Sequence, residues 1–433
     1  MSAAPTSSLD DASSGTRKQK SFEVMAKITK ALAREILDSR GNPTLEVSAF
    51  SDNNVGIFSV PSGASTGSHE ALEKRDGDKN RFNGMGVLKA VEIIEKTISP
   101  ALTGLDPSDQ RKIDGEILRL DGTSNKTNLG GNATTGVSIA CAKLAAKIKG
   151  AEVFEHLRSL ADIKSSRQTP LLFMNLINGG KHSQSPLAFQ EYHIVPQTDS
   201  VAEALEIGVE TQYALKKKIV DVLGTSSANL GDESGFVLEN PSVKKPLELL
   251  LEVMEENKLM NKIKLSMDVA ASSFYKDGAY EFDGKKYSGD ELMEFYARLI
   301  NLFPIISIED PFYEEDFGRF ANLLALKQIH VVGDDLTVTN TARLKEAVLK
   351  RSVDAIIIKP NQIGTLTETL EAMKFARDNN IECVVSHRSG ETNDDFIADL
   401  AFAFGCYGLK TGAPNGGERV AKYNRLLDIC KQK

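Results

Sequence analysis

The sequence predicts an α+β N-terminal capping domain followed by a (β/α)8-type barrel, and three observations support this fold class. The chain has 433 residues, which is too long for one ordinary domain and suits a barrel of about 250 residues plus a smaller domain. Strand-like runs precede helix-like runs in the N-terminal third, whereas from about Pro170 short β-branched runs alternate with helices. In this second part, ionisable residues directly follow several of the apolar runs.

The capping domain is expected to span residues 25–160, with a small sheet followed by helices. Residues 44–50 and 55–60 have the composition of strands and are separated by the turn SDNN. Apolar residues then recur at helical spacing, and the alanine-rich stretch 136–148 indicates a buried helix. Helices are expected at 86–98, from Pro107 toward Leu120, and at 136–148.

Residues 1–24 are expected to form a disordered N-terminal extension. This stretch is rich in Ser and Ala and lacks the apolar region of a secretory signal. A transit peptide is the alternative, but such peptides are poor in acidic residues, and Asp10 and Asp11 lie here. Ordered-looking sequence begins at Met25, which could itself serve as a start.

Composition and charge exclude several classes of function. The chain is 41% hydrophobic and 26% charged, which is usual for a globular protein with a large core. A net charge of −8 argues against whole-surface binding to nucleic acid or an anionic membrane, although it leaves room for a local basic pocket. No apolar run approaches the roughly 20 residues of a membrane-spanning helix. We therefore expect neither membrane insertion nor nucleic-acid binding as the main function.

Cysteine usage indicates a reducing, cytoplasmic location. The four cysteines form neither a C-x-x-C pair nor a zinc-like cluster. Reduced thiols in the cytosol are the simplest interpretation of Cys141, Cys383, Cys406 and Cys430.

The barrel is expected to span residues 161–433, and its strand ends carry the strongest functional signal. From Glu309 onward the strand-end residues are 25, 25, 28 and 23 positions apart, and each interval suits one strand–helix unit. Because the carboxyl ends of barrel strands meet at one face, we expect their side chains to converge in an active site. The six residues are Asp268, Glu309, Asp334, Lys359, His387 and Lys410.

Three of the six are carboxylates, which would repel one another unless a hard cation binds them. Oxygen ligands in near-octahedral geometry favour Mg²⁺. Glu309 and Asp334 each precede a second acid, so the ligand within each pair stays open, although strand alternation favours the first. Lys359 can act as a base where nearby positive charge lowers its pKa, whereas the carboxylates raise that pKa. The predicted reaction class is proton abstraction next to a carboxylate.

From about Lys27 to the C-terminus, the sequence resembles the enolase family. Ten segments in order carry the resemblance: DSRGNP, VPSGASTGSHEALE, MNLINGG, AFQE, LGDE, SIEDPF, GDDLTVTN, IIIKPNQIGTL, VSHRSGET and KTGAP. The resemblance implies reversible, Mg²⁺-dependent dehydration of 2-phospho-D-glycerate to phosphoenolpyruvate in glycolysis and gluconeogenesis, which is a carbon–oxygen lyase (hydro-lyase) reaction. A Lys or His base combined with one or two Mg²⁺ ions is a known feature of the enolase superfamily.

The resemblance also implies two Mg²⁺ ions in each active site. Asp268, Glu309 and Asp334 match the ligands of the first ion, which also holds the substrate carboxylate. Ser65, in the glycine-containing loop 62–70, matches a ligand of the second ion, which binds with substrate as the loop closes. Closure would exclude water and strengthen the charge interactions inside.

The catalytic and substrate-binding roles carry over by position. Lys359 resembles the base that removes the C2 proton, and Glu233 the general acid that helps the C3 hydroxyl leave. Glu191 resembles the partner carboxylate of Glu233, and Lys410 the lysine that binds the substrate carboxylate. The remaining matches are His182 and His387, which would line the substrate, and Arg388 and Ser389, which would bind its phosphate.

The sequence departs from the family pattern around the expected general acid. Ser234 follows Glu233 where the family usually has glycine, so a Cβ could shift this loop. His193 stands where an apolar residue is usual, and residues 415–417 read Asn-Gly-Gly in place of a more usual Ala-Arg-Ser. The segment between Glu233 and Asp268 is also shorter than in most enolases.

The resemblance implies a homodimer, but with an altered interface. Enolases pair a glutamate of the first domain with a C-terminal arginine across the interface. Glu46 matches that glutamate, whereas Asp428 occupies the arginine position, and two like charges would not form the pair. Arg425 could substitute from one helical turn earlier.

Three alternative functions are open to the same sequence. A dehydratase or racemase of the wider superfamily would share the three carboxylates, but is not expected to combine SGASTGSHE, LGDE and SHRSGET. A non-catalytic or moonlighting binding protein could retain the fold, although no predicted metal ligand is lost. A generic barrel enzyme acting on an unrelated phosphorylated substrate would not show all ten segments in order.

Overall fold

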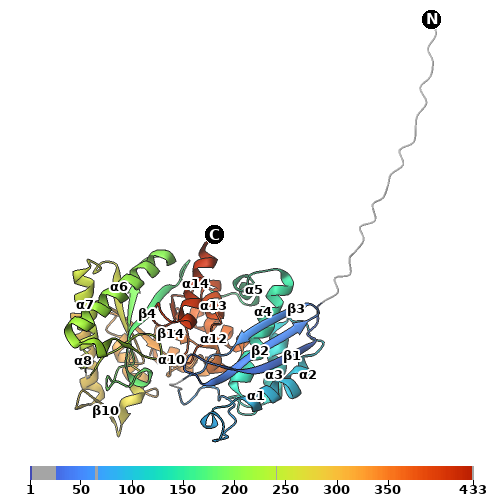
Figure 1. Cartoon of the computed structure of the whole chain (residues 1–433), viewed down its shortest axis with the longest axis horizontal. Coiled ribbons are helices and arrows are strands. Elements are labelled where there is room, and N and C mark those ends of the chain that lie inside the picture. The colour runs from blue at the N-terminus through green and yellow to red at the C-terminus, as the bar shows by residue number, and fades with distance from the viewer. Residues whose placement is uncertain (2–25, 64–66, 240, 432–433) are drawn as a thin grey trace.

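The computed structural model describes Met1 and residues 26–63, 67–239 and 241–431. The expected extension 1–24 lies outside the described residues apart from Met1, and Ser65 also lies outside them. Figure 1 shows a small N-terminal domain packed beside a larger barrel. Within the described residues, no helix combines the length and apolar composition that crossing a membrane requires.

The N-terminal domain begins with a three-stranded antiparallel sheet in the order β1-β2-β3. Helices then pack on one face of this sheet, as the α+β prediction required (Figure 1). The strands are β1 (Lys30–Leu37), β2 (Pro43–Ser51) and β3 (Asn54–Ser59). The helices are η1 (Phe82–Gly84), α1 (Leu88–Ile93), η2 (Ile94–Ile98), α2 (Ser99–Leu102), α3 (Gln110–Asp121), α4 (Gly131–Lys149) and α5 (Val153–Leu160).

Helix α4 forms the centre of the N-terminal core, and the expectation of a buried alanine-rich helix is confirmed. It is buried along nearly its whole length and packs on β2 and β3. Two glycines allow this close approach. A Cβ on Gly56 would lie 2.2 Å from the Ala140 carbonyl oxygen, and one on Gly136 would lie 2.6 Å from Val47. Small residues therefore set the distance between helix and sheet.

Eight strands close the barrel in the order β4-β5-β8-β12-β13-β14-β15-β16, and β16 pairs with β4. This closure confirms the barrel prediction. The strands are β4 (Leu171–Asn178), β5 (Glu191–Pro196), β8 (Ile263–Asp268), β12 (Ile305–Glu309), β13 (His330–Gly333), β14 (Ala355–Ile358), β15 (Glu382–Ser386) and β16 (Gly408–Lys410).

One barrel strand, β5, runs antiparallel to both of its neighbours. Its connection to β4 is residues 179–190, which contain only the short η3 helix (Gly180–His182). Without a crossover helix, consecutive paired strands form a hairpin and run antiparallel. The first residue of β5 therefore lies at the face where β4 and β8 end, which brings Glu191 to that face.

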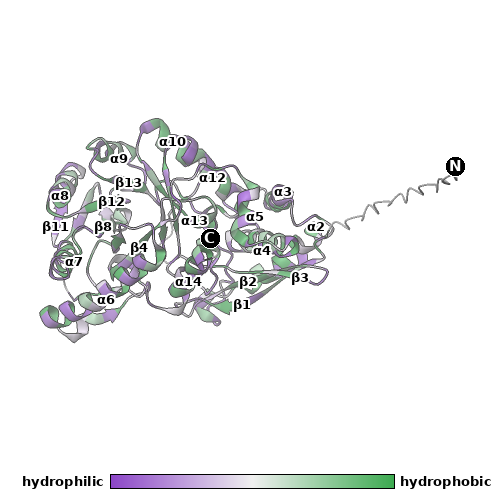
Figure 2. Ribbon diagram, turned by 90° about the horizontal axis from the view of Figure 1, so that it is seen from above, coloured by the Kyte–Doolittle hydropathy of each residue, from purple (hydrophilic) through white to green (hydrophobic). Residues whose placement is uncertain are grey.

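An outer ring of helices surrounds the strands, as Figure 2 shows from above. The longer helices are α6 (Val201–Leu223), α7 (Lys245–Glu256), α8 (Gly289–Leu302), α9 (Phe317–Leu324), α10 (Thr341–Lys350), α12 (Leu366–Asp378), α13 (Phe396–Ala403) and α14 (Gly417–Lys431). Smaller elements are η4 (Thr225–Ala228), β6 (Asn229–Leu230), β7 (Phe236–Val237), η5 (Ala271–Phe274), β9 (Tyr275–Lys276), β10 (Ala279–Phe282), β11 (Lys285–Tyr287) and α11 (Pro360–Ile363).

The barrel interior changes from apolar to charged along its axis. Side chains alternate between the two sides of each strand, so every second residue points inward. An apolar cluster fills the interior near the strand starts and includes Phe173, Val332 and Val384. Two residues further along, the alternation places Asp334 after Val332 and Ser386 after Val384. The charged face is thus supported by a packed apolar layer.

The N-terminal domain contacts the barrel beside this charged face. Helix α4 packs on α11, α3 on α12, and α5 on α13. A buried hydrogen-bond network joins the domains, because Asp114 accepts from the Thr367 backbone N–H (2.9 Å) and hydroxyl (2.6 Å). Ser62, at the start of the glycine-containing loop, exchanges two backbone hydrogen bonds with Gly390 of the barrel.

Candidate active site

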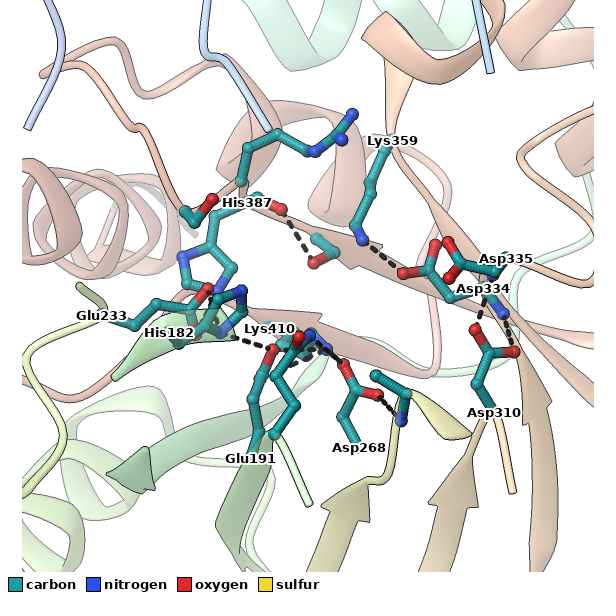
Figure 3. Close-up of a pocket in the computed structure, with 15 residues that line it drawn as sticks. His182, Glu191, Glu233, Asp268, Asp310, Asp334, Asp335, Lys359, His387 and Lys410 are labelled. Carbon is teal, nitrogen blue, oxygen red and sulfur yellow. Dashed lines mark hydrogen bonds and ion pairs between the residues drawn. The ribbon is translucent and has the colours of Figure 1, made fainter. Parts of the chain in front are cut away.

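A pocket opens at the carboxyl ends of the parallel barrel strands (Figure 3). It contains all the site residues predicted within the described chain except Glu309, whose carboxylate accepts a hydrogen bond of 2.9 Å from Lys410. The lining comprises His182, Gln190, Glu191, Glu233, Asp268, Ala270, Asp310, Asp334, Asp335, Lys359, Ser386, His387, Arg388, Ser389 and Lys410.

Strand register places three buried carboxylates in one row. Glu191 on β5 is the direct partner of Asp268 on β8, which is the direct partner of Glu309 on β12. Lys410 reaches all three from β16: its Nζ lies 2.9 Å from both Glu309 oxygens, 3.1 Å from Asp268 and 3.3 Å from Glu191. The lysine is itself only 2% exposed, so this charge is shielded from water.

Burial and mutual repulsion act on the pKa values of this row. Burial and the Asp268 charge hold the pKa of Glu309 well above its usual range, and burial also raises the pKa of Asp268. Burial would lower the pKa of Lys410, but the charges of Asp268, Glu191 and Glu309 raise it well above normal. The single positive charge of Lys410 therefore does not offset the burial and mutual repulsion of these carboxylates.

The carboxylates fit a divalent cation with hard oxygen ligands. One oxygen each from Asp268, Glu309 and Asp334 lies within 4.8 Å of the others, and all three residues are buried. An all-oxygen donor set at strand ends suits Mg²⁺, and a dication would relieve the repulsion described above. The same spacing holds for Asp310, Asp334 and Asp335.

The two tandem acid pairs differ in their hydrogen bonds. The Asp310 carboxylate accepts the backbone N–H groups of Asp334 (3.0 Å) and Asp335 (2.7 Å). This fixes the turn after β13, and Asp310 itself has a left-handed backbone conformation with φ of 42°. Asp310 therefore holds the loop that presents Asp334, in addition to lining the pocket.

Lys359 is ion-paired with Asp334 at 2.5 Å. Burial would lower the pKa of Lys359, but the Asp334 charge raises it above its usual value. Gln362 holds the other Asp334 oxygen, with a hydrogen bond of 2.8 Å from its side-chain amide. Lys359 is thus an ammonium group beside the carboxylate cluster.

On the opposite side of the pocket in Figure 3, Glu233 lies among histidines. His182 Nδ1 is 3.3 Å from Glu233 and 3.5 Å from Glu191, and His387 Nε2 is 3.4 Å from Glu233. Asn175 on β4 donates to Glu233 at 3.0 Å. Burial would raise the pKa of Glu233, but the two histidines and Arg419 lower it well below its usual range.

Arg419 sets the tautomer of His387. Its guanidinium is fully buried at the start of α14 and lies 2.6 Å from His387 Nδ1. Because arginine only donates, Nδ1 accepts, and the ring proton is on Nε2, which faces Glu233. Arg419 also donates to the backbone carbonyls of Asp232, Arg388 and Ser389, so it joins the Glu233 loop to the loop after β15.

The loop after β15 carries Arg388 and Ser389 into the pocket. Arg388 forms a buried ion pair with Glu70 at 2.9 Å and donates to Asn361 at 2.9 Å. A Cβ on Gly63 would lie 2.1 Å from the Arg388 guanidinium, so glycine is needed for this close approach. The glycine-containing loop and the expected phosphate site are therefore in direct contact.

The sequence reasoning missed several residues of this network. Glu70, Gln362 and Arg419 all lie in or next to recognised segments but received no role. Gln362 donates to both Glu70 (3.2 Å) and Asp334 (2.8 Å), which connects the loop to the carboxylates. These three residues do not directly follow an apolar strand, so only the folded structure shows that they contact the site.

The departures at Ser234 and Gly416 prove to be neighbours. Ser234 has a left-handed conformation with φ of 64°, which glycine adopts more easily than serine. A Cβ on Gly416 would lie 2.6 Å from the Ser234 hydroxyl oxygen. The glycine at 416 thus leaves room for the side chain at 234.

We predict that Ser234→Gly stabilises the fold by about 0.5–1 kcal/mol, because it removes the left-handed strain at some cost in unfolded-state entropy. Thermal unfolding of the variant and the unchanged chain measures this. Gly416→Ala is the matched control. It should destabilise the chain that has Ser234 more than it destabilises the Ser234→Gly variant. A lower melting temperature for Ser234→Gly would show that the hydroxyl itself is stabilising.

Comparisons with known proteins show the family of the chain. The family model "Enolase, N-terminal domain" matches residues 28–157, and "Enolase, C-terminal TIM barrel domain" matches 166–432. Similar proteins include the enolase of Methanopyrus kandleri, 46% identical over 94% of this chain and 96% of the relative. The enolase of Methanocaldococcus jannaschii is 45% identical over 93% of this chain and 94% of the relative. The enolase of Corynebacterium kroppenstedtii is 46% identical over 94% of this chain and 95% of the relative. The chain therefore belongs to the enolase family, whose enzymes are hydro-lyases named phosphopyruvate hydratases.

Proposed function

We propose that the protein catalyses the reversible dehydration of 2-phospho-D-glycerate to phosphoenolpyruvate. The observation that carries this proposal is the placement of Lys359 and Glu233 on opposite sides of one pocket, which the carboxylates of Asp268 and Asp334 also line. Removing a proton from C2 and a hydroxyl from C3 requires a base and an acid that reach neighbouring carbons. The proposed setting is glycolysis and gluconeogenesis in the cytoplasm, and the buried thiols of Cys141, Cys383 and Cys406 are consistent with that compartment.

The same proposal assigns two Mg²⁺ ions to the site. Asp268, Glu309 and Asp334 would hold the first, and Ser65 would contribute to the second when substrate binds. When bound, Mg²⁺ would supply positive charge for the substrate carboxylate as a second negative charge develops on it.

The chain's own residues would orient the substrate at both ends. Lys410 would contact the carboxylate, because its Nζ is centred on the acid row. Arg388 and Ser389 would bind the phosphate, and a guanidinium offers two parallel donors to a phosphate group. His182 and His387 would line the C3 side, next to Glu233 and its partner Glu191.

The pKa shifts of the two proposed groups correspond to the hydration direction. The raised pKa of Lys359 favours the ammonium form that delivers a proton to C2, and the lowered pKa of Glu233 favours the carboxylate that accepts one from the water that adds at C3. By microscopic reversibility the same groups serve dehydration once both have changed protonation state.

We expect the purified chain to form phosphoenolpyruvate from 2-phosphoglycerate, measured as an increase in ultraviolet absorbance. Activity should disappear with a chelator and return with Mg²⁺, because the carboxylate cluster needs a dication. A folded sample that stays inactive with Mg²⁺ would reject the proposal in favour of a binding role.

Replacement of the proposed base gives a more specific test. Lys359→Ala should lower exchange of the C2 proton with solvent by at least about 100-fold, because no other group would remove that proton. Exchange is followed by NMR with deuterated solvent. Lys350→Ala, on the exposed side of α10, is the control, and it should support exchange of the C2 proton at the same rate as the unchanged chain. Normal exchange in Lys359→Ala would exclude Lys359 as the base.

We also propose a homodimer that uses the outward face of the N-terminal sheet. Leu32 and Ile57 are 38% and 43% exposed there, and each is a direct cross-strand partner of Ser48 on β2. Glu46 on this face pairs with Arg34 of the same chain at 2.7 Å. Arg425, the expected substitute partner, is held by Asp399 (2.6 Å) and Glu152 (2.7 Å) of its own chain.

These intrachain pairs imply that the dimer does not depend on a Glu46–Arg425 contact. Light scattering at micromolar concentration should therefore give a dimer, and Arg425→Ala should leave the mass unchanged. A monomer at that concentration would contradict the proposed assembly.

A further inference from the structure

His193 forms a buried hydrogen bond to Glu191 that the proposed reaction does not yet explain. Its Nε2 lies 2.7 Å from Glu191 Oε2, and the two residues are 0% and 2% exposed. The other ring nitrogen, Nδ1, is buried and has no hydrogen-bond partner among the described residues. A buried nitrogen without a partner is unfavourable, so an apolar side chain would be expected unless the hydrogen bond has a use.

The surroundings of His193 fix how its ring bonds. On β5 it points into the barrel between Glu191 and Val195, with Asn175 and Ser266 as cross-strand partners. The Phe173 ring packs edge-on, with centroids 6.3 Å apart. Because a carboxylate accepts only, Nε2 carries the proton and donates to Glu191.

Glu191 is otherwise held by groups that substrate would contact. Lys410 lies 3.3 Å from Oε2 and 3.4 Å from Oε1, and His182 Nδ1 lies 3.5 Å from Oε1. Both of these partners face the pocket. His193 makes a closer contact of 2.7 Å and is not among the residues that line the pocket, so substrate binding would leave this hydrogen bond in place.

We infer that His193 is a positioning residue: it fixes the Glu191 carboxylate, which in turn sets the environment of the acid Glu233. The inference rests on the proposed function, since it concerns the same site. Burial and the Glu233 charge would raise the pKa of Glu191, but the charge of Lys410 and the hydrogen bond from His193 lower it. An ionised, fixed Glu191 then favours protonation of Glu233 when substrate has displaced its other partners.

Three substitutions at position 193 separate positioning from packing. His193→Gln places an amide nitrogen where Nε2 lies, so it keeps the donor. His193→Asn places its amide where Nδ1 lies and cannot reach Glu191. His193→Met fills the space with an apolar chain of similar length.

We expect His193→Met and His193→Asn to lower kcat about 10-fold or more, with KM changed less than about threefold, because the substrate contacts are intact. His193→Gln should restore kcat to within about threefold of the unchanged chain. Thermal unfolding of each variant confirms that it is folded under the assay conditions.

A second readout detects the hydrogen bond itself. In proton–nitrogen NMR of the chain, which has six histidines, one downfield ring N–H signal should disappear in His193→Met.

The outcomes separate this inference from the proposed function. If the unchanged chain is inactive with Mg²⁺, both fall. If it is active and His193→Met keeps kcat within about twofold, only the positioning role is overturned. Equal losses in His193→Gln and His193→Met would also overturn it, because the donor would then not matter.

Discussion

The structure depends on a row of like charges buried side by side in a closed barrel. Glu191, Asp268 and Glu309 are direct cross-strand neighbours, and Lys410 at the end of β16 contacts all three. Barrel closure makes this contact possible, because β16 returns to β4 and faces the row across the interior. Such a cluster is costly unless its charge is balanced, and that cost is typical of sites built for a cation and a charged substrate.

The N-terminal domain completes the site through one loop rather than through its sheet. Glu70 pairs with Arg388, and Gln362 bridges Glu70 to Asp334, so the loop and the carboxylate cluster share a hydrogen-bonded connection. Packing of α3, α4 and α5 on the barrel helices fixes the position from which this loop starts. The domain interface is therefore part of the candidate active site and does more than cover it.

Much of the site could be predicted from the sequence because of how barrels are built. A charged residue that directly follows an apolar strand must lie at one face, so Asp268, Asp334 and Lys359 could be placed together from their positions alone. The reversed direction of β5 could not, since it depends on a connection without a helix. The roles of Arg419 and Gln362 could not be predicted either, because they come from contacts between distant parts of the sequence. Arg419 is 32 residues from His387, and Gln362 is 28 residues from Asp334.

The departures from the family pattern lie on one half of the pocket, and the two halves are built differently. Ser234, His193 and Gly416 all surround Glu233 and Glu191, whereas every predicted carboxylate ligand is present. The carboxylate half is set by strand register, where a change of one residue would turn a side chain to the wrong face. The acid half is set by loops and by contacts between side chains, so one change can be accommodated by another, as Gly416 accommodates Ser234. Variation is therefore expected around the proposed general acid and not around the proposed metal ligands.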